Sequence, residues 1–66
     1  MNQYHIEIWE RSEAGPYQVY SGTCRAHSAP MAILPMVPRD VCIEGDERIA
    51  HAKADDGRLW HAELMA

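Results

Sequence analysis

The stretch RIAHAKADDGRLWHAEL, residues 48–64, determines how we expect this chain to fold. Asp55-Asp56-Gly57 divides it into two short runs in which small or apolar residues alternate with polar ones. Aspartate tolerates turn geometry, and glycine adopts a positive φ without steric cost. We therefore predict two antiparallel strands joined by a tight turn.

Two registers are possible for this hairpin, and they place different side chains on each face. A two-residue loop at Asp56-Gly57 mixes alanine with histidine and glutamate. A three-residue loop, closed by Gly57 in the left-handed conformation, pairs Ala52 with Trp60. It gathers six side chains on one apolar face: Ala50, Ala52, Ala54, Trp60, Ala62 and Leu64. Because a one-residue slip would lose this segregation, a buried face should fix the register, and we predict the three-residue loop.

The opposite face of the hairpin is mixed in character, with His51 and His61 directly opposed. We expect this face to be solvated or to contact a partner. On the apolar face, the small alanines beside Trp60 should leave a hollow in which another element packs.

The first part of the chain contains a second alternating pattern. In residues 4–11, Tyr4, Ile6 and Ile8 point one way, and residues 17–24 form the returning strand after a Gly-Pro loop at 12–16. We predict that Ile8 pairs with Val19. In this register the outward face carries five side chains: His5, Glu7, Trp9, Gln18 and Tyr20.

The segment between the two hairpins is rich in proline. Ser28 is a plausible N-cap with Pro30 in the first turn, and Pro35 disfavours a longer helix. We predict a helix of one to two turns near residues 28–35, followed by an extended link through Pro38. The side chains expected to face the sheet are Met31, Ile33 and Leu34. A wholly non-helical crossing is the alternative.

A short strand at residues 41–44 should lead into a turn at Gly45-Asp46, which sets Val41 opposite Ala50. The predicted fold is α+β: a small antiparallel sheet in the order strand, strand, short helix, strand, strand, strand. The short helix and the proline-rich crossing cover one face. Residues 1–66 form one domain, near the lower size limit at which a chain folds alone.

Charge and composition restrict the classes of partner. The net charge is −4, which argues against direct binding to a nucleic-acid backbone and suits docking onto a basic protein surface. No apolar run approaches the length of a membrane span, and MNQYHIEIWE is not typical of a signal peptide. Two cysteines are then most simply reduced thiols, so we expect the cytoplasm of a bacterial host.

No catalytic or cofactor motif is recognisable, and we expect a non-enzymatic protein without a cofactor or a metal. Zinc sites usually contain closely spaced ligand pairs, whereas Cys24 and Cys42 lie far apart in the sequence. The predicted His51/His61 pair could supply two ligands, which keeps a metal-binding regulator as a minor alternative.

The terminal hairpin also resembles a known class of small proteins. The residues that carry the resemblance are Ile49-Ala50, Lys53, Asp56-Gly57-Arg58 and Trp60. With these residues and its order of elements, the chain resembles the anti-CRISPR inhibitors of type I surveillance complexes that phages and mobile elements encode. The resemblance implies stoichiometric inhibition, in which the protein docks on a Cas subunit and blocks nucleic-acid binding. It transfers no functional residue, because these inhibitors share no invariant motif.

The residues expected to contact a protein partner are two aromatic side chains and three acids: Trp9, Tyr20, Glu44, Asp46 and Glu47. Exposed Trp and Tyr are enriched at binding hot spots, and the acids would face a basic surface. The alternative is a small homo-oligomeric accessory protein in which a sheet edge or the Trp9 face closes a homodimer.

Overall fold

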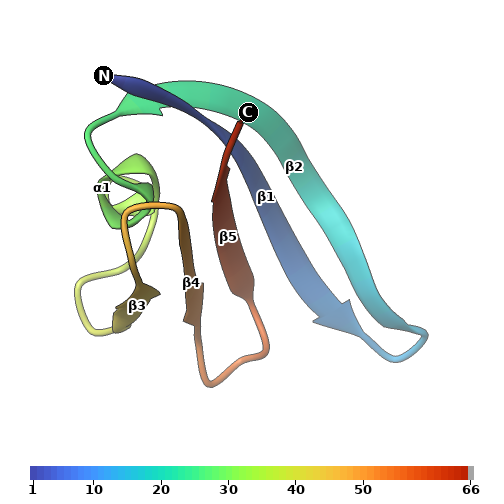
Figure 1. The fold of residues 1–66 in the computed structure, drawn as a ribbon. Helices are drawn as coiled ribbons and strands as arrows, with labels where there is room; N and C mark the ends of the chain where they lie inside the picture. Colours follow the sequence, from blue (N-terminus) through green and yellow to red (C-terminus); the bar gives the residue numbers. More distant parts are fainter. Residues whose placement is uncertain (66) are drawn as a thin grey trace.

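The computed structural model describes residues 1–65. Its elements are β1 (Asn2–Ser12), β2 (Gly15–Ala26), α1 (Ala29–Ile33), β3 (Ile43–Gly45), β4 (Ile49–Lys53) and β5 (Leu59–Leu64). The strands form one antiparallel sheet in the order β2-β1-β5-β4-β3, and α1 lies against one face (Figure 1). The predicted order of elements is confirmed, in a molecule that is mostly β.

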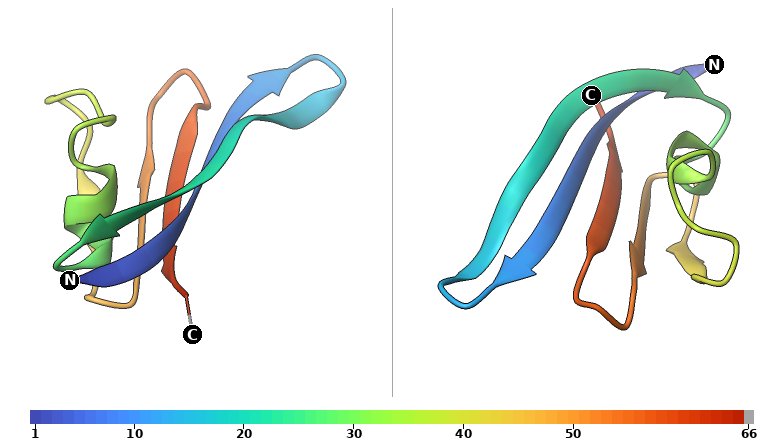
Figure 2. Two further views of the ribbon diagram at one scale, coloured as in Figure 1. Left: turned by 90° about the horizontal axis from the view of Figure 1, so that it is seen from above. Right: turned by 180° about the vertical axis from the view of Figure 1, so that it is seen from behind.

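The final strand, β5, inserts between β1 and β4, and this joins the two hairpins into one sheet. Strands β2 and β3 are left at the two edges. The long β1 and β2 extend beyond the other strands as a curved arm (Figure 2), and the molecule measures 38 × 23 × 16 Å. Within residues 1–65, no helix is long and apolar enough to cross a membrane.

The terminal hairpin has the predicted three-residue loop. Ala52 pairs with Trp60, and the amide of Ala54 donates to the carbonyl of Arg58 at 2.8 Å. Gly57 takes a φ of +94° and donates its N–H to the carbonyl of Ala54. The segregation of apolar side chains therefore identified the register correctly.

The core lies between the alanine face of the sheet and α1. Trp60 is only 2% exposed, and Ile33 of the helix is fully buried. The inward direction of Tyr4, Ile6 and Ile8 is confirmed: the first two are fully buried, and Ile8 packs against the cluster from its margin. The remaining members of the buried cluster are mostly small: Ala26, Ala29, Ala32, Val37, Ala50, Ala52 and Ala62.

The helix begins where the sequence predicts, because the Ser28 hydroxyl accepts from the amide of Met31 at 3.4 Å. Its buried face was predicted only in part. Ile33 faces the sheet, but Met31 and Leu34 are 51% and 59% exposed. The buried residues Ala29, Ala32 and Ile33 follow helical spacing from the first residue of the helix. Two alanines therefore face the sheet where we had predicted Met31 and Leu34.

The link after the helix is also more compact than the extended segment we predicted. Residues 34–36 form a turn, and the amide of Val37 donates to the carbonyl of Ile33 at 3.2 Å. This turn brings Val37 into the core.

The register of the first hairpin differs from the prediction in its inner half. Near the tip, Trp9 pairs with Gln18 as predicted, but Ile8 pairs with Tyr20, so Val19 is an extra residue in β2. This is a β-bulge, which period-two alternation does not reveal. The predicted loop at 12–16 is shorter too, because Ser12 already pairs with Gly15.

The register of β3 was predicted incorrectly, although its buried face was predicted correctly. Ile43 pairs with Ala52, and the strand covers Ile43–Gly45 instead of residues 41–44. The cause is the Asp46 carboxylate, which accepts from the amides of Arg48 at 2.8 Å and Ile49 at 3.1 Å and so moves the turn along the chain. The observed pairing of β3 with β4 is displaced from the predicted one by an even number of residues, so each side chain keeps its face of the sheet. Val41 and Ile43 therefore still pack against the core.

Candidate binding surfaces

The edge strand β2 is the longest exposed element. Tyr17, Val19 and Tyr20 are 47%, 44% and 44% exposed, and residues 15–24 contain no charged side chain. Proteins usually protect a sheet edge with charges, with proline or with a bulge, because its free N–H and C=O groups can pair with another strand. Here Pro16 and the bulge at Val19 lie toward the tip, and the strand continues beyond them to Ala26.

The bulge separates the two aromatic residues that we expected to share a surface. Directly paired side chains lie on the same face of a sheet, so Tyr20 shares the face of Ile8, whereas Trp9 points to the other side. The ring of Tyr20 lies over Gly22, where an added Cβ would come within 2.5 Å of the tyrosine hydroxyl. The expectation that Tyr20 and Trp9 point outward together is therefore wrong. Their role in binding stays a prediction.

The three predicted acids lie at the far end of the sheet from the tip of the arm. Glu44 is exposed on β3, with its carboxylate 3.5 Å from Nε2 of His51. Asp46 uses its carboxylate within the turn, and the two backbone hydrogen bonds from Arg48 and Ile49 lower its pKa. Glu47 is exposed at the same turn. The five predicted contact residues thus do not form one continuous surface, and their contact with a partner stays a prediction.

A row of charged and imidazole side chains crosses the face opposite α1. Glu7 pairs with His61, His61 with His51, and His51 with Glu44, one residue from each of four strands. The predicted opposition of the two histidines is confirmed. In the part of the chain that the structure covers, residues 1–65, no three His, Cys, Asp or Glu side chains converge as a metal site.

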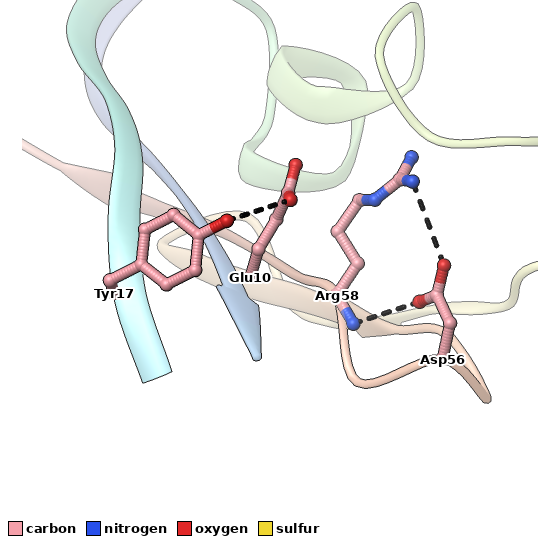
Figure 3. A network of polar contacts seen from close by, with 4 residues as sticks. All are labelled: Glu10, Tyr17, Asp56 and Arg58. Atoms are coloured by element: carbon pink, nitrogen blue, oxygen red, sulfur yellow. Dashed lines mark hydrogen bonds and ion pairs between the residues drawn. The ribbon is translucent and has the colours of Figure 1, made fainter. Parts of the chain in front are cut away.

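On the face that carries α1, a hollow of about 460 Å³ lies between the segment that follows the helix and the terminal turn. The space beside the alanines, in which we expected another element to pack, is filled by α1. The Arg58 guanidinium lies over the Trp60 ring at 5.6 Å, and its Nη2 is 3.6 Å from the Asp56 carboxylate. Figure 3 shows the Arg58–Asp56 pair beside Glu10, which accepts a hydrogen bond from the Tyr17 hydroxyl at 3.3 Å. The Arg58–Asp56 and Tyr17–Glu10 contacts are exposed, and contacts of this kind contribute little stability.

A second hollow lies on the opposite face, at the base of the arm. It has a volume of about 480 Å³ and is lined by Trp9, Arg11, Pro16, Lys53, Gly57 and Leu59. Sequence reasoning missed this site because it depends on the pairing of β1 with β5, which the sequence did not indicate. Two signals were available: the alternation of β1 placed Trp9 on the outward face, and the predicted register of the terminal hairpin set Lys53 opposite Leu59.

Comparisons with protein-family models, with curated proteins and with solved structures find no match to this chain.

Proposed function

We propose that this chain acts by binding another protein, without catalysis, and that the β1–β2 arm is the main contact. The observation that carries the proposal is the exposed, uncharged β2 edge with Tyr17, Val19 and Tyr20 along it. An extended partner segment can add to such an edge through main-chain hydrogen bonds, while side-chain contacts provide specificity.

The molecule exposes somewhat more surface than a compact protein of its mass. A compact protein of 7.5 kDa exposes about 4,200 Å². This chain exposes 4756 Å², roughly a tenth more.

The proposed partner is a subunit of a type I CRISPR surveillance complex, which the chain would prevent from binding nucleic acid. The resemblance of the terminal hairpin to anti-CRISPR inhibitors and the net charge of −4 support this partner. Exposed Glu44 and Glu47 would meet basic side chains of the Cas subunit. Asp46 is better left out of this electrostatic contact, because its carboxylate holds the turn.

The test measures target-DNA binding by a purified type I surveillance complex while the protein is titrated in. Wild-type protein should abolish DNA binding near one molecule per complex. Val19→Lys places a charge on the β2 edge and should relieve the inhibition, whereas Met31→Lys, an equally exposed substitution on α1, should not. Undiminished DNA binding with excess wild-type protein would exclude this partner, and equal effects of the two variants would exclude the arm.

Self-association through the same edge is the second candidate. Two copies of β2 can approach without charge repulsion along residues 15–24, even though the whole chain is acidic. Sedimentation equilibrium at micromolar concentration distinguishes the two: a dimer that Val19→Lys dissociates supports this candidate, and a monomer of wild-type protein removes it.

A further inference from the structure

The hollow at the base of the arm is assembled from four strands and the turn between β4 and β5, on one face of the sheet. Trp9 of β1 pairs with Leu59 of β5, and Leu59 pairs with Lys53 of β4. Arg11 lies two residues beyond Trp9 on the same side and pairs with Pro16. The indole, the leucine and the proline ring therefore form an apolar floor, with one cation on each side.

The two cations are available to a ligand. Within residues 1–65, neither Arg11 nor Lys53 takes part in an ion pair or a side-chain hydrogen bond. Among residues 1–65, no carboxylate lines the hollow, although the chain has ten acidic residues. Arg11 also lines a neighbouring hollow, together with Glu10, Asp56 and Arg58.

The turn of the terminal hairpin supports one of these cations. A Cβ added to Gly57 would lie 2.9 Å from Cβ of Arg11. The turn thus packs against the root of the arginine side chain, and the absence of a side chain at Gly57 permits this approach. The main chain of the turn therefore lies close to Cβ of Arg11, which places the base of this side chain beside the hollow.

We propose that this hollow binds a polypeptide segment of a partner in which an apolar side chain adjoins a carboxylate. The apolar side chain would rest on Trp9 and Leu59, and the carboxylate would lie between Arg11 and Lys53. A concave apolar site with a few convergent polar groups is the usual form of a ligand site. At physiological salt, exposed charges farther apart than about 8 Å are largely screened, so a carboxylate in the hollow would interact mainly with the charges that line it, Arg11 and Lys53.

The site requires neither pairing at the β2 edge nor a Cas subunit, so it can be tested with the isolated protein. The probe is a five-residue peptide of alternating glutamate and leucine, acetylated and amidated at its ends, titrated into ¹⁵N-labelled protein and followed by NMR. We expect saturable shifts of the Trp9 indole N–H and of the Gly57 and Leu59 amides. The affinity should fall as salt increases, because the attraction between carboxylate and cations is screened.

Two charge-removing variants and one control locate the contact. Lys53→Gln and Arg11→Gln should each weaken peptide binding by about two- to fivefold, as expected for an exposed charge pair. Arg39→Gln changes the net charge equally on an exposed loop away from the hollow and should leave the affinity unchanged. Lys53 lies on an exposed position of β4, so its variant retains the fold even if Arg11→Gln disturbs the turn.

Four results would overturn the proposal. The first two are an absence of saturable shifts and shifts centred on other residues. The other two are equal binding of a glutamine-leucine peptide and an affinity that all three variants leave unchanged. Two further controls address other occupants. An oligothymidylate that produces the same shifts more strongly would assign the hollow to single-stranded nucleic acid. Shifts that depend on protein concentration alone would assign it to a second copy of the chain.

Discussion

The hydroxyl of Tyr4 donates a hydrogen bond of 2.7 Å to the main-chain carbonyl of Glu47, 43 residues along the chain. The amide of Ala29 donates to the same oxygen at 3.1 Å. One carbonyl therefore joins β1, the start of α1 and the turn between β3 and β4. This contact holds the helix and both hairpins in register at the end of the sheet farthest from the arm.

Removing the Tyr4 hydroxyl tests the strength of this junction. Tyr4→Phe keeps the buried ring and should lower the free energy of unfolding by about 1 kcal/mol, the net contribution of one hydrogen bond. Urea denaturation measures the change. Tyr20→Phe is the matched control: its exposed hydroxyl has no hydrogen-bond partner within residues 1–65, so the loss should stay within about 0.5 kcal/mol. Equal losses in the two variants would contradict the role of the junction.

The two large residues at the end of α1 should respond very differently to truncation. Ile33→Ala removes a fully buried side chain and should cost about 2–5 kcal/mol, a large share of the stability of so small a domain. Leu34→Ala, at the adjacent and exposed position, should change the stability by less than about 0.5 kcal/mol. Thermal unfolding followed by circular dichroism compares the two, and a larger loss at Leu34 would contradict the helix orientation.

Asp46 makes the stability depend on acid pH. Its pKa is lowered in the folded chain by hydrogen bonds from the amides of Arg48 and Ile49, so the unfolded state takes up the proton first. The stabilisation is complete above the unfolded pKa of about 3.9 and is lost as the pH falls through the lower folded value.

Asp46→Asn measures this effect, because asparagine retains an acceptor oxygen without the charge. The wild type should be more stable than the variant above about pH 4, and the difference should shrink as the pH falls further. Urea denaturation across this range provides the comparison. A difference that does not vary with pH would show that the charge of Asp46 has no role in the turn.

The two thiols should react at different rates. Cys42 is exposed, whereas Cys24 is half-buried with its Sγ 3.7 Å from the carbonyl of Ala32. A disulfide reagent such as dithionitrobenzoate should therefore modify Cys42 quickly and Cys24 slowly, because reaction requires an accessible thiolate. Cys42→Ser should abolish the fast phase and retain the slow one. Two fast phases in the wild type would show that α1 does not protect Cys24.

The parts of the fold that depend on local chemistry could be predicted from the sequence. The Asp-Gly turn and the alanine face identified the terminal register, and Ser28 identified the start of the helix. Two other registers depend on single events that leave no periodic signal: the extra residue at Val19 and the side-chain hydrogen bonds of Asp46. A period-two pattern determines which face of a strand is buried. It does not reveal an extra residue in one strand or a turn that is displaced along the chain.

The candidate site was harder to predict because it depends on contacts between the hairpins. Trp9 was correctly placed on the face away from Ile8, but Leu59 meets it only because β5 pairs with β1, and Lys53 of β4 is brought near through β5. The same tertiary step places the acids far from the arm. Separate analysis of each hairpin identifies suitable residue types but does not show which of them meet.

The bulge in β2 also determines which changes of chain length the protein tolerates. Val19 has no partner of its own on β1, and the pairs on either side of it, Trp9 with Gln18 and Ile8 with Tyr20, are consecutive on that strand. Deleting Val19 would therefore leave every remaining pair intact and straighten the arm. If a paired neighbour such as Gln18 or Tyr20 were deleted instead, Val19 would have to take its place on β2 to keep the pairing with β1. Val19 is thus a residue of β2 that does not contribute to the pairing with β1 and instead affects the direction of the arm.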